Sequence, residues 1–139
     1  MKAAGLVVEY NPFHNGHQYH LDQSLARTKA DIAVGVMSGN FLQRGEPALV
    51  NKWARTKMAL KAGVDLIVEL PFVHAVQKAE YFSEAAILLL EELQCEWVCF
   101  GSEKGEIEPF TDTYALLAEH SDIIDHQAKT FMDAGHSYP

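Results

Sequence analysis

One stretch decides the fold: Gly5-Leu6-Val7-Val8-Glu9-Tyr10-Asn11-Pro12-Phe13-His14-Asn15-Gly16-His17-Gln18-Tyr19-His20. The apolar run over residues 3–8 predicts a short buried strand, and Asn11-Pro12 predicts a turn. Helical spacing begins at His14, and the apolar face of that helix is expected to comprise Tyr19, Leu21, Leu25 and Ala26. A strand, a tight turn and a helix start form an anion cradle, because free backbone N–H groups and the positive end of the helix dipole point at the turn.

Two histidines and a glycine give this turn its predicted chemistry. Gly16 lacks a Cβ, so a phosphate or a nucleobase can approach the backbone there. His14 and His17 are three residues apart, and both imidazoles can face one ligand if the helix begins at residue 15 or 16. Preorganised donors stabilise the charge that grows on phosphoryl and leaving oxygens during in-line attack. The residues by themselves therefore predict adenylyl transfer from ATP.

The rest of the chain alternates between short apolar strands and helices. Further strands are expected at residues 31–37, 64–70 and 95–100, and further helices at 51–62, 78–93, 108–119 and 121–133. This alternation predicts a Rossmann-like three-layer α/β/α fold, with a parallel sheet and helices on both of its faces. Ligands of such sheets bind beyond the carboxyl ends of the strands. Four segments are expected there: Tyr10–His17, Ser38–Glu46, Glu69–Phe72 and Gly101-Ser102.

Five sequence blocks, in a fixed order, resemble one protein family. His14-x-Gly16-His17 is similar to the HxGH motif of the nucleotidylyltransferase superfamily, which also includes class I aminoacyl-tRNA synthetases. The longer blocks are residues 5–17, 37–47, 52–60, 69–72 with 75–79, and 100–103. Together they resemble the bacterial tRNA(Met) cytidine acetate ligase family (TmcAL) over most of the chain. A lone HxGH motif is a weak signal, whereas the ordered set is specific.

This resemblance implies a nucleotidylyltransferase-like ATP-binding domain over residues 1–139. The implied reaction is the ATP-dependent ligation of acetate to the wobble cytidine of elongator tRNA(Met), through acetyl-adenylate, with Mg²⁺ neutralising the pyrophosphate. His14 and His17 would be catalytic, because they would stabilise the phosphoryl transition state. The implied ATP-binding residues are Val7, Val8, Glu9, Tyr10, Asn11, Pro12, Phe13, His14, Asn15, Gly16, His17, Gln18, Tyr19, His20 and Gly101.

The C-terminal part departs from the family's pattern. The family carries a second catalytic block, rich in Ser and Thr and containing an Arg, and no such motif is found in these residues. The chain is therefore expected to be an N-terminal portion that supplies the ATP site and acetylates no tRNA by itself. Two alternatives stay open: a small-molecule adenylyltransferase of the phosphopantetheine or nicotinate mononucleotide type, and an inactive nucleotide-binding fragment.

The basic residues are concentrated between positions 44 and 61. Arg44, in a Gly/Pro loop, and Lys52 are interpreted as contacts to phosphate or to the tRNA backbone. Lys57 and Lys61 are interpreted as a solvated helix face, and Trp53 as a packing residue. The net charge of −8 argues against nucleic-acid binding by bulk electrostatics, so a tRNA-binding surface would be local or lie elsewhere.

Three carboxylates and one further histidine lie near strand ends or the first helix. Glu9 ends the first strand and is expected either to bond a ribose hydroxyl or to hold the turn. Asp31 and Asp65 begin strands, away from the predicted site, and are interpreted as structural. His20 is expected either to face the nucleotide or to be solvated.

No metal site is predicted. His14, His17 and His20 recur every third residue, but such ligands fan around a helix by about 60° per step and suit a single zinc ion poorly. Cys95 and Cys99 are expected to be reduced core thiols on the same side of a strand. A signal peptide and a membrane-length segment are not visible, which predicts a cytoplasmic protein with no membrane partner.

Overall fold

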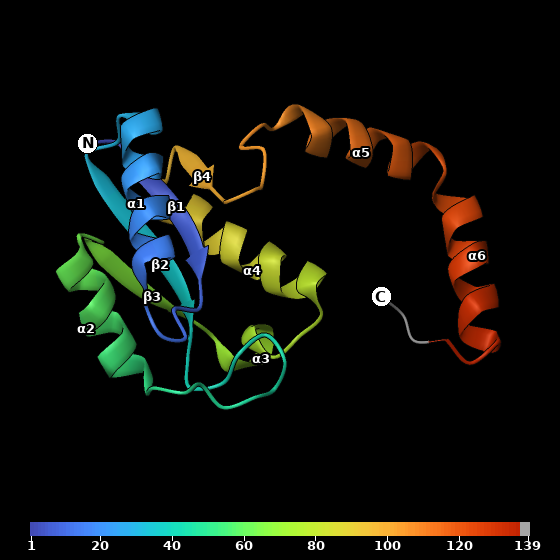
Figure 1. Ribbon diagram of the computed structural model, residues 1–139, viewed down its shortest axis with the longest axis horizontal. Helices are drawn as coiled ribbons and strands as arrows, with labels where there is room; N and C mark the ends of the chain where they lie inside the picture. The colour runs from blue at the N-terminus through green and yellow to red at the C-terminus, as the bar shows by residue number, and fades with distance from the viewer. Residues whose placement is uncertain (137–139) are drawn as a thin grey trace. The chain divides into compact units, whose positions relative to one another are not determined.

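The structure is a computed structural model that describes residues 1–136 (Figure 1). The chain divides into two compact units, one spanning Met1–Gly101 and the other beginning at Ser102. The first unit contains the sheet and every residue of the predicted site.

Four parallel strands form the sheet of the first unit. They are β1 (Ala3–Val8), β2 (Ile32–Ser38), β3 (Leu66–Leu70) and β4 (Trp97–Cys99), in the spatial order β3-β2-β1-β4. The connections carry α1 (Asn15–Thr28), α2 (Lys52–Ala62), α3 (Phe72–Ala75) and α4 (Ala79–Glu92). The predicted α/β/α fold is therefore confirmed, with each predicted strand and helix present within a few residues. The short helix α3 was not predicted.

The two faces of the sheet carry separate hydrophobic clusters. The α1–α2 cluster joins Leu21 and Ala59 of these helices to Leu6, Val8 and other strand residues. The α4 cluster joins Ala86 and Leu90 to Val34, Val36 and other strand residues on the opposite face. Alternate side chains of β1 thus enter different clusters, as the period of two along a strand requires.

The two cysteines follow these clusters, and the prediction that they face the same side is wrong. Cys99 packs against the α1–α2 cluster, whereas Cys95 packs against the α4 cluster. The reason is that β4 covers only residues 97–99, so Cys95 lies before the strand and outside its alternation. Both are free thiols, and burial raises the pKa of Cys95.

The strand order places a topological switch point between β1 and β4. Successive crossovers move from β1 to β2 and β3 toward one edge, and the chain then returns to pair β4 with the other side of β1. Open α/β sheets bind ligands outside the carboxyl ends of the strands at such a point. The two segments that leave the strands there are the turn after β1 and Gly101 after β4.

Helix ends follow the local sequence signals in the first unit. Asn51 caps α2, with its Oδ1 accepting from the Ala54 N–H at 3.0 Å, and Gly63 ends that helix at a φ of 108°. In α1 the inward side chains are Leu21, Ser24 and Leu25. The predicted apolar face is wrong for Tyr19 and Ala26, which are both exposed, whereas Ser24 takes an inward position and bonds back to the His20 carbonyl.

The second unit contains α5 (Glu108–Glu119) and α6 (Ser121–Asp133). Pro109 occupies the first turn of α5, where proline is favoured, whereas the start of α6 at Ser121 has no side-chain cap bond. Neither helix has a buried residue among those described. Within residues 1–136, no helix is both long enough and apolar enough to cross a membrane.

Candidate functional site

The start of α1 is built by two histidines that cap each other's backbone. His14 is the N-cap residue, and its Nδ1 accepts a hydrogen bond from the Gly16 N–H at 3.1 Å. His17, three residues on, accepts from the His14 N–H through its own Nδ1 at 3.2 Å. The imidazole rings stack with their centroids 3.7 Å apart and their planes inclined by 23°. The structure thus brings together the two residues that the sequence predicted to be catalytic.

This reciprocal capping fixes the tautomer of both rings. A nitrogen that accepts from a backbone N–H carries no hydrogen, so in each neutral imidazole the hydrogen lies on Nε2. Burial, followed by the proximity of His14 and then of His20, lowers the pKa of His17 and favours its neutral form. The site therefore offers two Nε2–H donors, held side by side beside the first free N–H groups of α1.

Tyr10 and Phe13 pack against the capping pair. The Tyr10 ring meets His17 edge-on with centroids 4.9 Å apart, and it meets Phe13 in the same manner at 4.8 Å. Tyr10 is buried at a φ of 49°, and burial raises its pKa to about 12. The Asn11–Pro12 peptide bond of this turn is cis. These ring contacts hold the His17 imidazole in place on one side.

Gly16 is required by the cap itself. A Cβ at this position would lie 2.9 Å from Cε1 of His14, within the ring that accepts the Gly16 N–H. The sequence predicted Gly16 as an opening for a ligand, and the structure adds that any side chain there displaces the capping imidazole. The cap and the approach of a ligand therefore both depend on the absence of a Cβ at Gly16.

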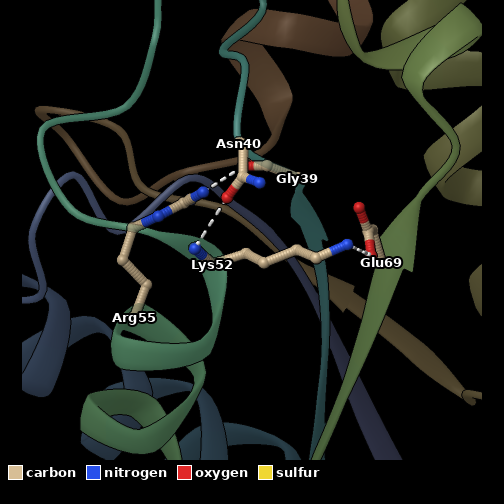
Figure 2. A network of polar contacts seen from close by, with 5 residues as sticks. All are labelled: Gly39, Asn40, Lys52, Arg55 and Glu69. Carbon is tan, nitrogen blue, oxygen red and sulfur yellow. Dashed lines mark hydrogen bonds and ion pairs between the residues drawn. The ribbon is translucent and has the colours of Figure 1, made fainter.

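Arg55 of α2 joins the carboxyl ends of β1 and β2 (Figure 2). Its guanidinium donates to the carbonyls of Glu9 at 2.6 Å, Val50 at 3.0 Å and Gly39. The side chain is 0% exposed, and burial lowers its pKa while Glu9 and Glu69 act in the opposite direction. The sequence did not predict this role, since it shows Arg55 only as one of the basic residues between positions 44 and 61. The available signal was its position four residues before the buried Ala59.

Glu9 holds the loop that follows β2. Its Oε1 accepts from the Gln43 N–H at 2.8 Å and from the Ser38 hydroxyl at 3.3 Å. The sequence left two roles open for Glu9, a bond to a ribose hydroxyl or holding the turn; the structure instead bonds its carboxylate to the loop after β2, and the ribose contact stays a prediction. Asn11 acts similarly, since its Oδ1 accepts from the Leu49 N–H at 2.8 Å. Both residues therefore fasten the loop between β2 and α2 to the end of β1.

Lys52 and Trp53 begin α2. Figure 2 shows the ion pair of Lys52 with Glu69, in which the ammonium lies 2.5 Å from Oε2. The same ammonium lies 5.3 Å from the centroid of the Trp53 ring. Trp53 is 68% exposed, so the prediction that it is a packing residue is wrong; its ring lies along the solvent side of α2. Arg44 lies exposed in the loop after β2. Contacts of Arg44 and Lys52 to phosphate or tRNA remain predictions.

The other residues that the resemblance implies for ATP lie on β1, in the turn and along α1, and their contact with ATP remains a prediction. Val7 and Val8 end β1, Pro12 and Asn15 flank the turn, and Gln18 bonds to Asp22 and to the Ala62 carbonyl. Nε2 of His20 is buried with no hydrogen-bond partner among the described residues, and burial lowers the pKa of His20.

Gly101 lies across the switch point, after β4. A Cβ there would meet no atom within 4 Å, and its φ lies outside the left-handed region, so the described protein gives no reason for glycine at this position. The open space beside Gly101 is therefore compatible with the ligand contact that the sequence predicted.

The predicted carboxylates at the opposite end of the sheet are structural, as expected. Asp31 Oδ2 accepts from the Lys2 N–H at 2.7 Å, and Asp65 Oδ2 accepts from the Ala33 N–H at 2.8 Å. Across residues 1–136, no group of three or more His, Cys, Asp or Glu side chains is arranged to hold a metal ion. The polar groups converge instead at the carboxyl ends of β1 and β2.

Fold and site together define a class: a Rossmann-like domain in which a helix start bearing paired imidazoles faces the switch point of a parallel sheet. The chain belongs to the HIGH Nucleotidyl Transferase family, whose profile matches residues 1–139.

Relatives of known name agree with this assignment. The chain is 58% identical over 139 residues to the tRNA(Met) cytidine acetate ligase of Bacillus subtilis (strain 168) and 53% identical to that of Caldicellulosiruptor bescii. Each alignment covers 100% of this chain and 34% or 35% of the relative, so the chain spans about a third of their length. The crystal structure of Thermotoga maritima TmcAL bound with alpha-thio ATP superposes with a TM-score of 0.85 and 44% identity, over 100% of this chain and 34% of that one.

Proposed function

We propose that this chain supplies the ATP site of a tRNA(Met) cytidine acetate ligase. The observation that carries the proposal is the reciprocal cap of His14 and His17, which holds two imidazoles side by side at the start of α1 and leaves both Nε2–H groups outside the cap. The name of the Bacillus subtilis relative and the nucleotide analogue in the Thermotoga maritima structure support this choice over a small-molecule adenylyltransferase.

In the proposed reaction, a carboxylate oxygen of acetate attacks the α-phosphorus of ATP. The bond between the α-phosphorus and the oxygen that bridges the α- and β-phosphates breaks, pyrophosphate leaves with the electron pair, and acetyl-adenylate remains. The two imidazoles donate to the phosphoryl oxygens as charge grows on them, which lowers the barrier without a protein nucleophile. Mg²⁺ in such reactions is held largely by phosphates and water, and we assign no residue of this chain as its ligand.

The second step transfers the acetyl group to tRNA. N4 of the wobble cytidine attacks the acetyl carbon, the bond from that carbon to the phosphate oxygen breaks, AMP leaves, and N4 loses one proton. The product is N4-acetylcytidine. Because the chain spans about a third of its relatives' length, the proposed second step also uses groups outside residues 1–139.

Acetate-dependent exchange of labelled pyrophosphate into ATP tests the first step. The intact native gene product is incubated with ATP, pyrophosphate and acetate, with no tRNA present. We expect exchange that requires acetate. Exchange that instead requires phosphopantetheine or nicotinate mononucleotide, or no exchange with any acceptor, would contradict the proposal.

A further inference from the structure

A groove borders the carboxyl end of β1 on the α4 side of the sheet. Its volume is about 490 Å³, and its walls come from the end of β1, the loop after β2 and the first turns of α4. Val7 and Phe82 supply apolar wall, and both pack against the α4 cluster. Glu9, Gln43, Glu80 and Ser83 supply the polar groups. The strand end that forms one wall continues directly into the His14–His17 turn.

The polar side chains of this groove mainly accept hydrogen bonds. Glu9 and Glu80 are carboxylates, and the first of them keeps Oε2 beyond the bonds that its Oε1 makes with Gln43 and Ser38. The Ser83 hydroxyl donates to the Glu80 carbonyl at 3.0 Å, which leaves its oxygen to accept. The Gln43 side-chain amide donates one hydrogen bond to the Gln77 carbonyl at 3.0 Å. The side chains of this groove therefore favour a ligand that brings N–H donors and no negative charge, while the free N–H groups of Ala79 and Glu80 at the start of α4 can donate to an acceptor atom of the same ligand.

We propose that the groove receives the cytosine ring of the acceptor nucleotide, with its exocyclic amine directed at Glu80 and Glu9. The inference rests on the proposed function, because it places the group that accepts the acetyl beside the site where the adenylate forms. A carboxylate accepts from the cytosine N4 amine, whereas uracil presents an acceptor oxygen at the same position. The Phe82 ring and Val7 give the flat base an apolar surface.

Acetate is a poorer occupant of the same groove. Two carboxylates in the walls repel an anion, and the volume far exceeds what a two-carbon acid fills. The charge of the groove thus separates the two substrates: the anionic one goes to the imidazole donors of α1, and the amine goes to the carboxylates of the groove.

Amide NMR shifts of the 139-residue chain test this directly, with cytidine, uridine and acetate added separately. Cytidine is expected to shift the amides of Gln43, Ala79 and Ser83, and to do so more strongly than uridine. Glu80→Gln is expected to weaken cytidine binding about tenfold, while Phe82→Ala weakens both nucleosides. Glu91→Gln, the same charge change in the last turn of α4 and outside the groove, is the matched control and leaves binding unchanged.

Four results would overturn the inference: equal shifts by uridine, groove shifts by acetate without cytidine, no cytidine shift in the folded chain, or equal effects of E80Q and E91Q. E80Q changes an exposed residue, so it keeps the test decisive if F82A does not fold. Adding ATP to the same sample separates the two proposals. Shifts at His14, Gly16 and His17 report on the ATP site, and their absence counts against the proposed function without altering the cytidine readout.

Discussion

The starts of α1 and α4 lie on opposite faces of the sheet and are built from opposite chemistry. At α1, His14 and His17 cap the backbone and no acidic residue occupies the first turn. At α4, Lys78 is the N-cap residue without a side-chain cap bond, and Glu80 lies in the first turn. Both helix starts carry the same free N–H groups and the same dipole. The comparison teaches that the side chains at a helix start decide whether that start binds an anion or offers hydrogen-bond acceptors.

The change with the largest expected effect removes Arg55, whose guanidinium bonds to the backbone at the ends of β1 and β2. Arg55→Met leaves the buried carbonyls of Glu9, Gly39 and Val50 without a donor, so the free energy of unfolding should fall by about 3 kcal/mol or more. Urea unfolding followed by circular dichroism measures it. Lys57→Met, on the exposed side of α2, is the control. A loss no greater than that of the control would show that Arg55 does not join the strand ends.

The second change removes the imidazole donor of His17 at the start of α1. His17→Gln keeps a cap acceptor at the third helical position but removes the imidazole donor, so acetate-dependent pyrophosphate exchange should fall about 100-fold with little change in stability. The native gene product is assayed beside His74→Ala, which alters an exposed histidine of α3 in the same unit. Unchanged exchange in H17Q would remove His17 from the reaction.

A third, smaller effect separates capping from catalysis at His14. His14→Ala should lower the free energy of unfolding by about 1 kcal/mol, because the Gly16 N–H loses its acceptor. His14→Asn should restore most of that loss, since asparagine is a good N-cap residue, while exchange activity stays low in both variants. Equal unfolding midpoints for H14A and H14N would mean that the cap contributes nothing.

The smallest expected effect is a pH dependence of stability. The folded chain holds the pKa of His17 below the ordinary histidine value of about 6.5, so the unfolded chain binds more protons as pH falls. Stability is therefore full above about pH 6.5 and declines below it, down to the pKa of the folded state. H17Q should flatten this decline in urea titrations, whereas His126→Gln, an exposed control in α6, should not. A steeper decline in H17Q would reverse the assigned sign.

Local pattern predicted the fold and half of the site. The apolar runs and the helix signals at Asn51 and Gly63 are read from neighbouring residues, which is why the strands and helices were placed within a few residues. The His14-x-Gly16-His17 spacing predicted paired imidazoles for the same reason. Trp53 was assigned wrongly and Arg55 was given no role, because helical spacing does not state which face packs against the sheet.

By itself, the sequence determined the parallel α/β architecture and the placement of two imidazoles at the first helix start, since both depend on residues within one or two turns of each other. Only the tertiary structure decided that Arg55 is buried among three carbonyls, that Glu9 holds the loop after β2, and that β4 pairs beside β1. The Arg55–Glu9 and Gln43–Glu9 bonds join residues 46 and 34 positions apart, and the pairing of β4 with β1 depends on strand order. Their physical basis is the satisfaction of buried polar groups across the fold, which a local sequence pattern does not record.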